Sequence, residues 1–212
     1  MGFREAIQHY AGQPLTKPVL LELLKEYKRP YDKINELVKQ GMLTQIKRGF
    51  YIPGPKLTIA KPESFLIANH LLGPSYVSLD AALSYWGLIP ERVYEISSVT
   101  TLHTKTYKTE LGRFSYAHIP LPYYSFGIKQ IELTKQQTAL IATPGKALCD
   151  KIVTTKGILL RSKKQVIELL TENLRIDKQA LRNLNVAEMN SWVKDAPKKN
   201  SLSMLVKTLK EL

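Results

Sequence analysis

The residues best suited by type and spacing to do chemistry lie near the N-terminus, in the run Lys47-Arg48-Gly49. Two short apolar segments of strand character, Met42–Ile46 and Phe50–Ile52, flank this run, and Gly49 permits a tight turn between them. Two cations at the tip of a β-hairpin can contact phosphate oxygens, an interaction driven by counterion release. The run therefore predicts a basic hairpin that lies on a nucleic-acid backbone.

Helices must precede this hairpin if it is to be positioned on a duplex. Thr16 can cap a helix that has Pro18 in its first turn and an apolar stripe beyond it. The Lys28-Arg29 pair forms the turn, and Pro30 begins a further helix that runs to Gly41. Helix, turn, helix and basic hairpin in this order predict a winged helix-turn-helix over residues 1–55.

The helix that begins at Pro30 has two faces at 3.6-residue spacing. Its apolar face comprises Ile34, Leu37 and Val38, with Tyr31 beside them and Asn35 on the flank nearer the core. Its polar face carries Asp32, Lys33, Glu36, Lys39 and Gln40. Arg29 and Lys33 lie near the helix start, where recognition helices touch base edges, so Lys33 ranks above Asn35 as a base reader. The predicted DNA-binding residues are Thr16, Lys17, Arg29, Tyr31, Lys33, Glu36, Lys39, Lys47 and Arg48.

The charge distribution agrees with a basic head. The 212-residue chain carries 31 Lys+Arg against 18 Asp+Glu, a formal net charge of +13. Residues 1–61 hold 11 basic and 5 acidic residues, residues 62–150 hold 7 of each, and residues 151–212 hold 13 and 6. This pattern favours polyanionic partners at both ends of the chain and a structural centre between them.

Other chemistry finds little support in the sequence. Four scattered histidines lack metal-ligand spacing, and the single Cys149 excludes an internal disulfide and a cysteine-based zinc site. Pro144-Gly145-Lys146 lacks the upstream glycine and the following Ser/Thr of a phosphate-binding loop. We therefore expect no metal, no cofactor and no enzymatic activity. The absence of a long apolar run or a signal peptide predicts a cytoplasmic protein that does not enter a membrane.

The rest of the chain predicts a second domain. Pro53-Gly54-Pro55 marks a linker that extends to about Lys61. Residues 62–212 then read as a mixed α/β domain with a short strand at Tyr76–Leu79 and further strands at 92–101, 113–119, 128–133 and 138–143, followed by a helical tail from about Ser162. The expected fold class is thus α+β. On the tail, Lys163 and Lys164 are candidate partner-binding residues.

Three segments together resemble the AbiEi family of antitoxins from type IV toxin–antitoxin systems. They are the head, particularly Gly41-Met42-Leu43 followed by Lys47–Tyr51, the segment Tyr76–Leu88 running on to Thr100-Thr101, and the segment Ala142–Asp150. In order and spacing they cover roughly residues 1–155. The chain departs from the family pattern at Gly145, where an acid is usual, and at Cys149, where an aliphatic residue is usual.

The resemblance implies a DNA-binding domain that represses its own operon. Because one short recognition helix reads too few base pairs to be selective alone, we expect repeated half-sites in the protein's own promoter. It also implies a second domain that neutralises a nucleotidyltransferase-like toxin without forming a stable complex. Two alternatives remain open: a solitary winged-helix regulator with a ligand- or partner-sensing second domain, and, more distantly, an enzyme that acts on nucleic acid.

Overall fold

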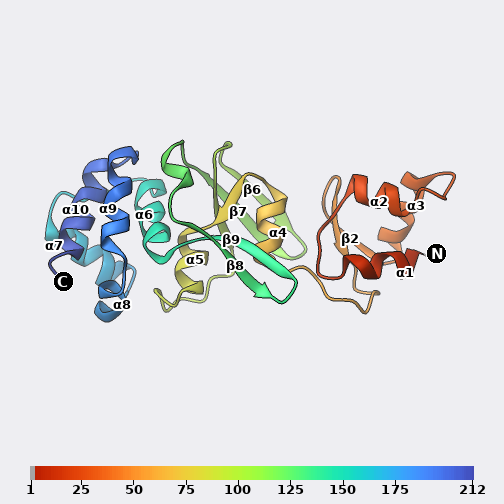
Figure 1. Ribbon diagram of the computed structural model, residues 1–212, viewed down its shortest axis with the longest axis horizontal. Helices are drawn as coiled ribbons and strands as arrows, with labels where there is room; N and C mark the ends of the chain where they lie inside the picture. The colour runs from red at the N-terminus through yellow and green to blue at the C-terminus, as the bar shows by residue number, and fades with distance from the viewer. Residues whose placement is uncertain (1–2) are drawn as a thin grey trace.

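The computed structural model describes residues 3–212 and has the expected α+β composition. Three parts follow one another along the long axis of the molecule in Figure 1: an N-terminal head, a central sheet with its helices, and a group of C-terminal helices. Among residues 3–212, no helix is both long and apolar enough to cross a membrane.

The head contains short helices and a three-stranded antiparallel sheet of order β1-β3-β2. The chain begins with a short α-helix at Phe3–Ala6 that continues as a 3-10 turn, and Gly41, at φ +72°, follows the helix that begins at Pro30. The predicted hairpin is confirmed, whereas the two-residue strand that completes the sheet is too short to show in the sequence. The elements are α1 (Phe3–Ala6), η1 (Ile7–Tyr10), β1 (Leu15–Thr16), α2 (Lys17–Leu23), α3 (Pro30–Lys39), β2 (Leu43–Lys47) and β3 (Phe50–Pro53).

The central part is built on a six-stranded mixed sheet of order β6-β7-β5-β4-β9-β8. The pairs β4–β9 and β5–β7 are parallel, and the other neighbours are antiparallel. Its elements are α4 (Ser64–Leu71), β4 (Ser75–Val77), α5 (Leu79–Tyr85), β5 (Ile96–Thr100), β6 (Lys105–Thr109), β7 (Gly112–His118), η2 (Tyr123–Ser125), β8 (Ile128–Thr134), β9 (Gln137–Ala142) and α6 (Pro144–Thr154).

Most strands of this sheet agree with the sequence prediction, and β6 is the exception. The predicted strands correspond to β4, β5, β7, β8 and β9, with β5 shorter than expected at Ile96–Thr100. Strand β6 was not predicted, because the sequence Lys-Thr-Tyr-Lys-Thr is largely polar and lies at the edge of the sheet, where one side of the strand has no neighbour.

The C-terminal part is helical, as expected, and packs on α6. Its last helix, α10, contacts α6, α7, α9 and η4. The helices are interrupted around Pro197, between the end of η4 and the start of α10. The elements are α7 (Lys163–Ile167), η3 (Glu168–Asn173, a π-helical segment), α8 (Lys178–Arg182), α9 (Val186–Trp192), η4 (Val193–Asp195) and α10 (Lys199–Leu209).

The segment expected to be a linker is packed against the head. Pro53 is the last residue of β3, and the N–H of Gly54 donates to the carbonyl oxygen of Met42 at 2.8 Å. A Cβ at Gly54 would overlap the backbone of Gly41 and Met42, and Leu57 is buried in the head's own core. Residues 54–57 are therefore an ordered extension of the head.

The hairpin also packs on the central part of the molecule. Ile46, Phe50 and Ile52 belong to the same buried cluster as Leu71 and Tyr76 of the central part. At the expected boundary between residues 55 and 62 the two pieces therefore share an apolar contact through the hairpin, while most buried residues of the head form a cluster of their own.

A second contact reinforces this junction from β9. The Gln137 side chain is buried, accepts from the N–H of Glu63 at 2.7 Å and donates to the carbonyl of Lys61 at 3.1 Å. Nearby, the Gln13 amide donates to the carbonyl of Gln136 at 3.2 Å. The tip of the β8–β9 hairpin thereby holds both the head and the connecting segment.

We predict that Phe50→Ala destabilises the whole protein by about 3–5 kcal/mol, because it leaves a cavity where the hairpin meets the central cluster. Tyr94→Ala is the matched control: this aromatic ring is 79% exposed, so its loss should change stability by about 1 kcal/mol or less. Urea denaturation followed by circular dichroism measures both. Equal effects of the two substitutions would contradict the shared core.

Candidate functional site

A polar cleft lies between the start of α2, helix α3 and the β2–β3 hairpin. It encloses about 320 Å³ and is lined by Lys17, Tyr31, Ile34, Asn35, Gln45, Arg48, Gly49 and Tyr51. The backbone N–H of Lys17 donates to the carbonyl of Gly49 at 2.9 Å, which fixes the start of α2 against the hairpin turn. The Lys17 ammonium lies 4.5 Å from the centroid of the Tyr31 ring. Among these lining residues, all within the described chain, none is acidic.

The other exposed side of α3 has a different character, because its cations are paired with carboxylates. Lys33 Nζ lies 2.9 Å from Glu36 Oε1, and Arg29 lies 3.7 Å from Asp32. The hydrogen bond from Lys33 lowers the pKa of Glu36, so this carboxylate stays ionised. Two carboxylates on this side repel phosphates, and the cleft is therefore the surface better suited to an anionic partner.

The structure changes the ranking of residues on α3. The expectation that Asn35 lies nearer the core is wrong, since its side chain is exposed and borders the cleft. Tyr31, expected beside the apolar face, is 54% exposed. By contrast, the Lys33 side chain is only 23% exposed and is held by Glu36. Tyr31 and Asn35, which lie one helical turn apart on the same side of α3 and both line the cleft, thus replace Lys33 at the centre of the candidate interface.

The remaining predicted residues divide into two groups. The cleft brings together Lys17, Tyr31 and Arg48, with Thr16 exposed beside Lys17. Arg29, Lys33 and Glu36 line the opposite side of α3, and Lys39 is exposed near its end. Gln45 was not singled out from the sequence, and alternation gave no signal for it, because the pairing register of β2 shifts between Gln45 and Lys47 and its buried residues do not alternate with exposed ones.

Lys47 lies between the hairpin and the central part of the molecule, although its position in the hairpin predicted a contact with DNA. Its ammonium group donates to the carbonyl oxygen of Leu71, at the end of α4, and lies 5.6 Å from the centroid of the Tyr107 ring. The side chain is half-buried between the hairpin and the central sheet. Lys47 is thus engaged in the contact between the two parts, whereas the adjacent Arg48 is exposed.

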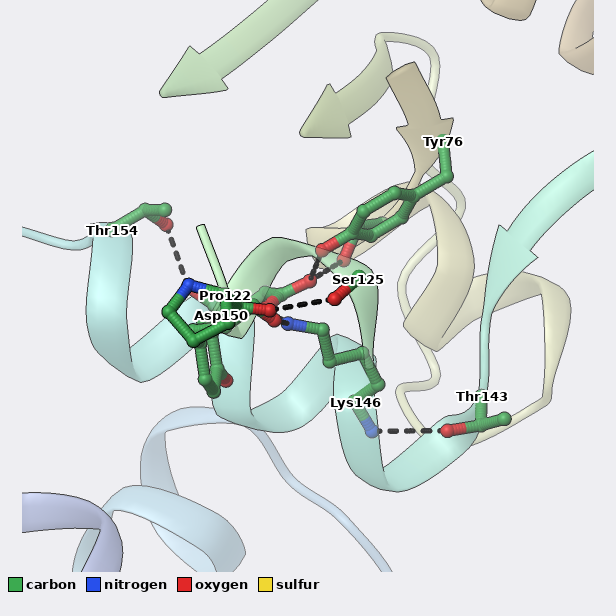
Figure 2. Close-up of polar contacts among 9 residues, drawn as sticks. Tyr76, Pro122, Ser125, Thr143, Lys146, Asp150 and Thr154 are labelled. Carbon is green, nitrogen blue, oxygen red and sulfur yellow. Dashed lines mark hydrogen bonds and ion pairs between the residues drawn. The ribbon is translucent and has the colours of Figure 1, made fainter. Parts of the chain in front are cut away.

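A buried polar network lies in the central part, where Tyr76, Lys146 and Asp150 converge in Figure 2. The side chains of Lys146 and Asp150 are fully buried and form an ion pair of 2.8 Å between Nζ and Oδ1. The hydroxyl groups of Tyr76 and Ser78 donate to Asp150 Oδ2 at 2.9 and 2.8 Å. Lys146 Nζ also donates to the carbonyl of Tyr123 at 3.0 Å and lies 3.5 Å from its ring centroid.

The environment of this network is that of a structural core. Burial lowers the pKa of Lys146, an effect that the neighbouring Asp150 carboxylate opposes. Burial also raises the pKa of the Cys149 thiol to about 12, which keeps it protonated and unreactive. Because Lys146 and Asp150 are inaccessible to solvent, no substrate can reach them, and their role is to join α6 to β4.

Gly145 lies where the tail packs against α6. A Cβ at this position would lie 2.8 Å from Cγ of Met189, a residue of α9 in the C-terminal part. Helix α9 therefore packs on the start of α6, and a larger side chain at residue 145 would have to displace the Met189 side chain.

The basic residues of the tail are partly used in structural contacts. Lys163 pairs with Glu211 at 2.8 Å, and both side chains remain about half exposed. Lys198 Nζ donates to the carbonyls of Ile152, Thr155 and Ile158, so it fixes the end of α6. Lys164 is exposed on α7 and is the freer member of the predicted partner-binding pair.

Comparisons with known proteins identify no family. No model of a known protein family matches the chain, and no curated protein is significantly similar to it.

Substitution of the buried lysine tests the role of the network. We predict that Lys146→Met costs about 3–5 kcal/mol of folding free energy, because it leaves the Asp150 carboxylate buried without its counter-charge. Lys151→Met, in the same helix, removes a partly exposed pair with Asp80 and should cost about 1 kcal/mol or less. Chemical denaturation of the two variants compares them directly; similar losses would rule out a special contribution from the buried pair.

Proposed function

We propose that the protein is a DNA-binding transcriptional repressor that acts on its own promoter. The observation that carries this proposal is the acid-free polar cleft formed by α2, α3 and the hairpin. The order of elements α1-η1-β1-α2-α3-β2-β3 supports the assignment of a winged helix-turn-helix, in which the second helix of the pair enters the major groove. The net charge of +13 supplies the long-range attraction that DNA-binding proteins use.

Within the cleft we assign different roles to the charged and the neutral residues. Lys17 lies at the start of α2 and Arg48 at the adjacent hairpin turn, where both line the cleft beside α3 and suit phosphate contacts. Asn35 lies on α3 itself and offers an amide, the group that pairs in bidentate fashion with the N6 and N7 edge of adenine. Binding strength then comes mainly from the charged residues, and sequence preference from Asn35.

Two substitutions separate these roles. Arg48→Ala should weaken binding to all duplexes alike and reduce the slope of log K against log salt by about 1, as expected for one lost phosphate contact. Asn35→Ala should relax preference at one base pair, with a loss of about 1–3 kcal/mol on the preferred site only. Titration of promoter and scrambled duplexes at several salt concentrations measures both effects.

The matched control is Lys25→Ala, which removes an exposed lysine that is paired with Glu22 on the head and lies outside the cleft lining. It should leave affinity and salt slope nearly unchanged. If Lys25→Ala and Arg48→Ala weaken binding equally, general charge attraction and not the cleft accounts for binding. No detectable promoter binding by the unaltered protein would overturn the proposal.

Autoregulation requires the protein to recognise more base pairs than one short helix can contact. A single recognition helix contacts a few base pairs, so we expect repeated half-sites in the protein's own promoter, each bound by one copy. Footprinting over the native promoter should show two or more protected repeats. One unrepeated site, or none, would count against autoregulation.

A second proposed function is that of a type IV antitoxin that counters a nucleotidyltransferase-like toxin without a stable complex. The support is the resemblance to the AbiEi family, whose two later segments, Tyr76–Leu88 and Ala142–Asp150, meet here in the network around Asp150. The alternative is a solitary regulator whose central and C-terminal parts sense a ligand or partner.

Full-length variants distinguish these two possibilities better than fragments, because the head and the central part share buried surface. Co-expression with the product of an adjacent toxin gene should restore growth even for the double variant Asn35→Ala/Arg48→Ala, which is impaired only in DNA binding. Charge reversal at Lys163 and Lys164 should weaken this rescue if the tail contacts the partner. Absence of rescue by the unaltered protein would leave the solitary regulator as the better description.

A further inference from the structure

A second cavity, separate from the candidate DNA interface, lies between α4 and the exposed face of β8 and β9. It encloses about 390 Å³, within the range of pockets that hold small molecules in proteins. Its apolar surface comes from Leu66, Pro74, Ala139 and Leu140. Its polar surface comes from Asn69, His70, Ser75, Tyr124, Gln130 and Thr138.

At this cavity the side chain of Asn69 takes the place of a neighbouring strand beside Leu140 of β9. Asn69 accepts from the backbone N–H of Leu140 at 2.7 Å and donates to the carbonyl of the same residue at 3.3 Å. It thus takes the hydrogen bonds that a neighbouring strand would make, because β4 pairs with β9 only at Val77 and Ile141. Asn69 is a positioning residue that keeps the cavity in place.

The other polar groups of the cavity retain unused hydrogen-bonding capacity. The Ser75 hydroxyl, in a residue only 3% exposed, has no hydrogen-bond partner among residues 3–212. Gln130 uses its Nε2 on the Thr138 hydroxyl at 3.1 Å, which leaves its amide oxygen available. Burial raises the pKa of Tyr124 to about 12 and lowers that of His70, so both side chains are neutral near pH 7.

The residues that line this cavity are neutral, and this composition indicates which class of ligand it can bind. Although 23% of the chain is charged, no Asp, Glu, Lys or Arg is among the described residues that line this cavity. A charged ligand would lose hydration there without gaining a counter-charge. A flat ring can instead lie on Tyr124 and Pro74 while its edge exchanges hydrogen bonds with groups such as Gln130.

We propose that this cavity binds an uncharged heteroaromatic molecule with hydrogen-bonding edges, of the chemical type of a nucleoside. Such a molecule offers an aromatic face and an edge with both donors and acceptors, which matches the mixture of donors and acceptors in the lining. The site is independent of DNA binding by the head, since none of its lining residues belongs to the candidate DNA interface.

Isothermal titration of the full-length protein with adenosine, cytidine and uridine, in the absence of DNA, tests the proposal. At least one nucleoside should bind with a dissociation constant below about 1 mM, and its 5′-monophosphate should bind more weakly at physiological salt. Gln130→Leu and Tyr124→Leu should each weaken nucleoside binding about tenfold, the effect of one lost hydrogen bond or stacking contact.

Gln136→Leu provides the matched control, because this exposed glutamine lies on the same hairpin but outside the cavity, and its loss should leave affinity unchanged. Circular dichroism confirms that each variant is folded. The proposal is overturned if no nucleoside binds, if the monophosphate binds more tightly than its nucleoside, or if Gln130→Leu and Tyr124→Leu bind as the unaltered protein does. Each result leaves the proposed DNA binding untouched.

Discussion

The buried pair between Lys146 and Asp150 is the interaction on which the arrangement of the molecule depends. Two opposite charges without solvent are tolerable only when hydrogen bonds satisfy both, and here Tyr76, Ser78 and the Tyr123 carbonyl do so. Because these partners come from β4 and η2, the pair fixes helix α6 against the sheet in one position. The C-terminal helices then pack on α6, so their placement follows from that of the pair.

The junction between the head and the central sheet imposes a second constraint. Lys47 reaches the end of α4, and the apolar side of the hairpin continues the central core. A hairpin bound on one side and exposed at Arg48 on the other cannot move freely relative to the sheet. In the proposed repressor, the orientation of the DNA-binding cleft is therefore linked to the central part by packing and not by a flexible tether.

Charge is arranged along the chain in a way that agrees with this construction. On α3 the acidic residues and their lysine and arginine partners occupy one side, while the neutral Tyr31 and Asn35 face Lys17 and Arg48 on the other. Several cations of the tail, among them Lys163 and Lys198, are engaged within the protein. The net charge therefore overstates the number of cations available to a partner.

The sequence by itself determined the fold class, the helices α2 and α3, the hairpin and most strands of the central sheet. These features depend on local signals: Pro30 at a helix start, Gly41 and Gly49 at positive φ, and apolar alternation along strands. The resemblance to a known family singled out the segments that contain Tyr76 and Asp150, but the sequence did not show that these two residues are in contact.

Only the tertiary structure decided which side of α3 is available and what Lys47 contacts. A helical wheel orders residues around the helix axis, but it does not show which neighbouring element covers each side. For this reason the sequence ranked Asn35 below Lys33 as a residue that contacts bases. Likewise, Pro53-Gly54-Pro55 has the composition of a linker, yet Gly54 is there because the backbone of Gly41 lies too close for a side chain. Contacts between residues distant in the chain decide such cases, and a local pattern carries no information about them.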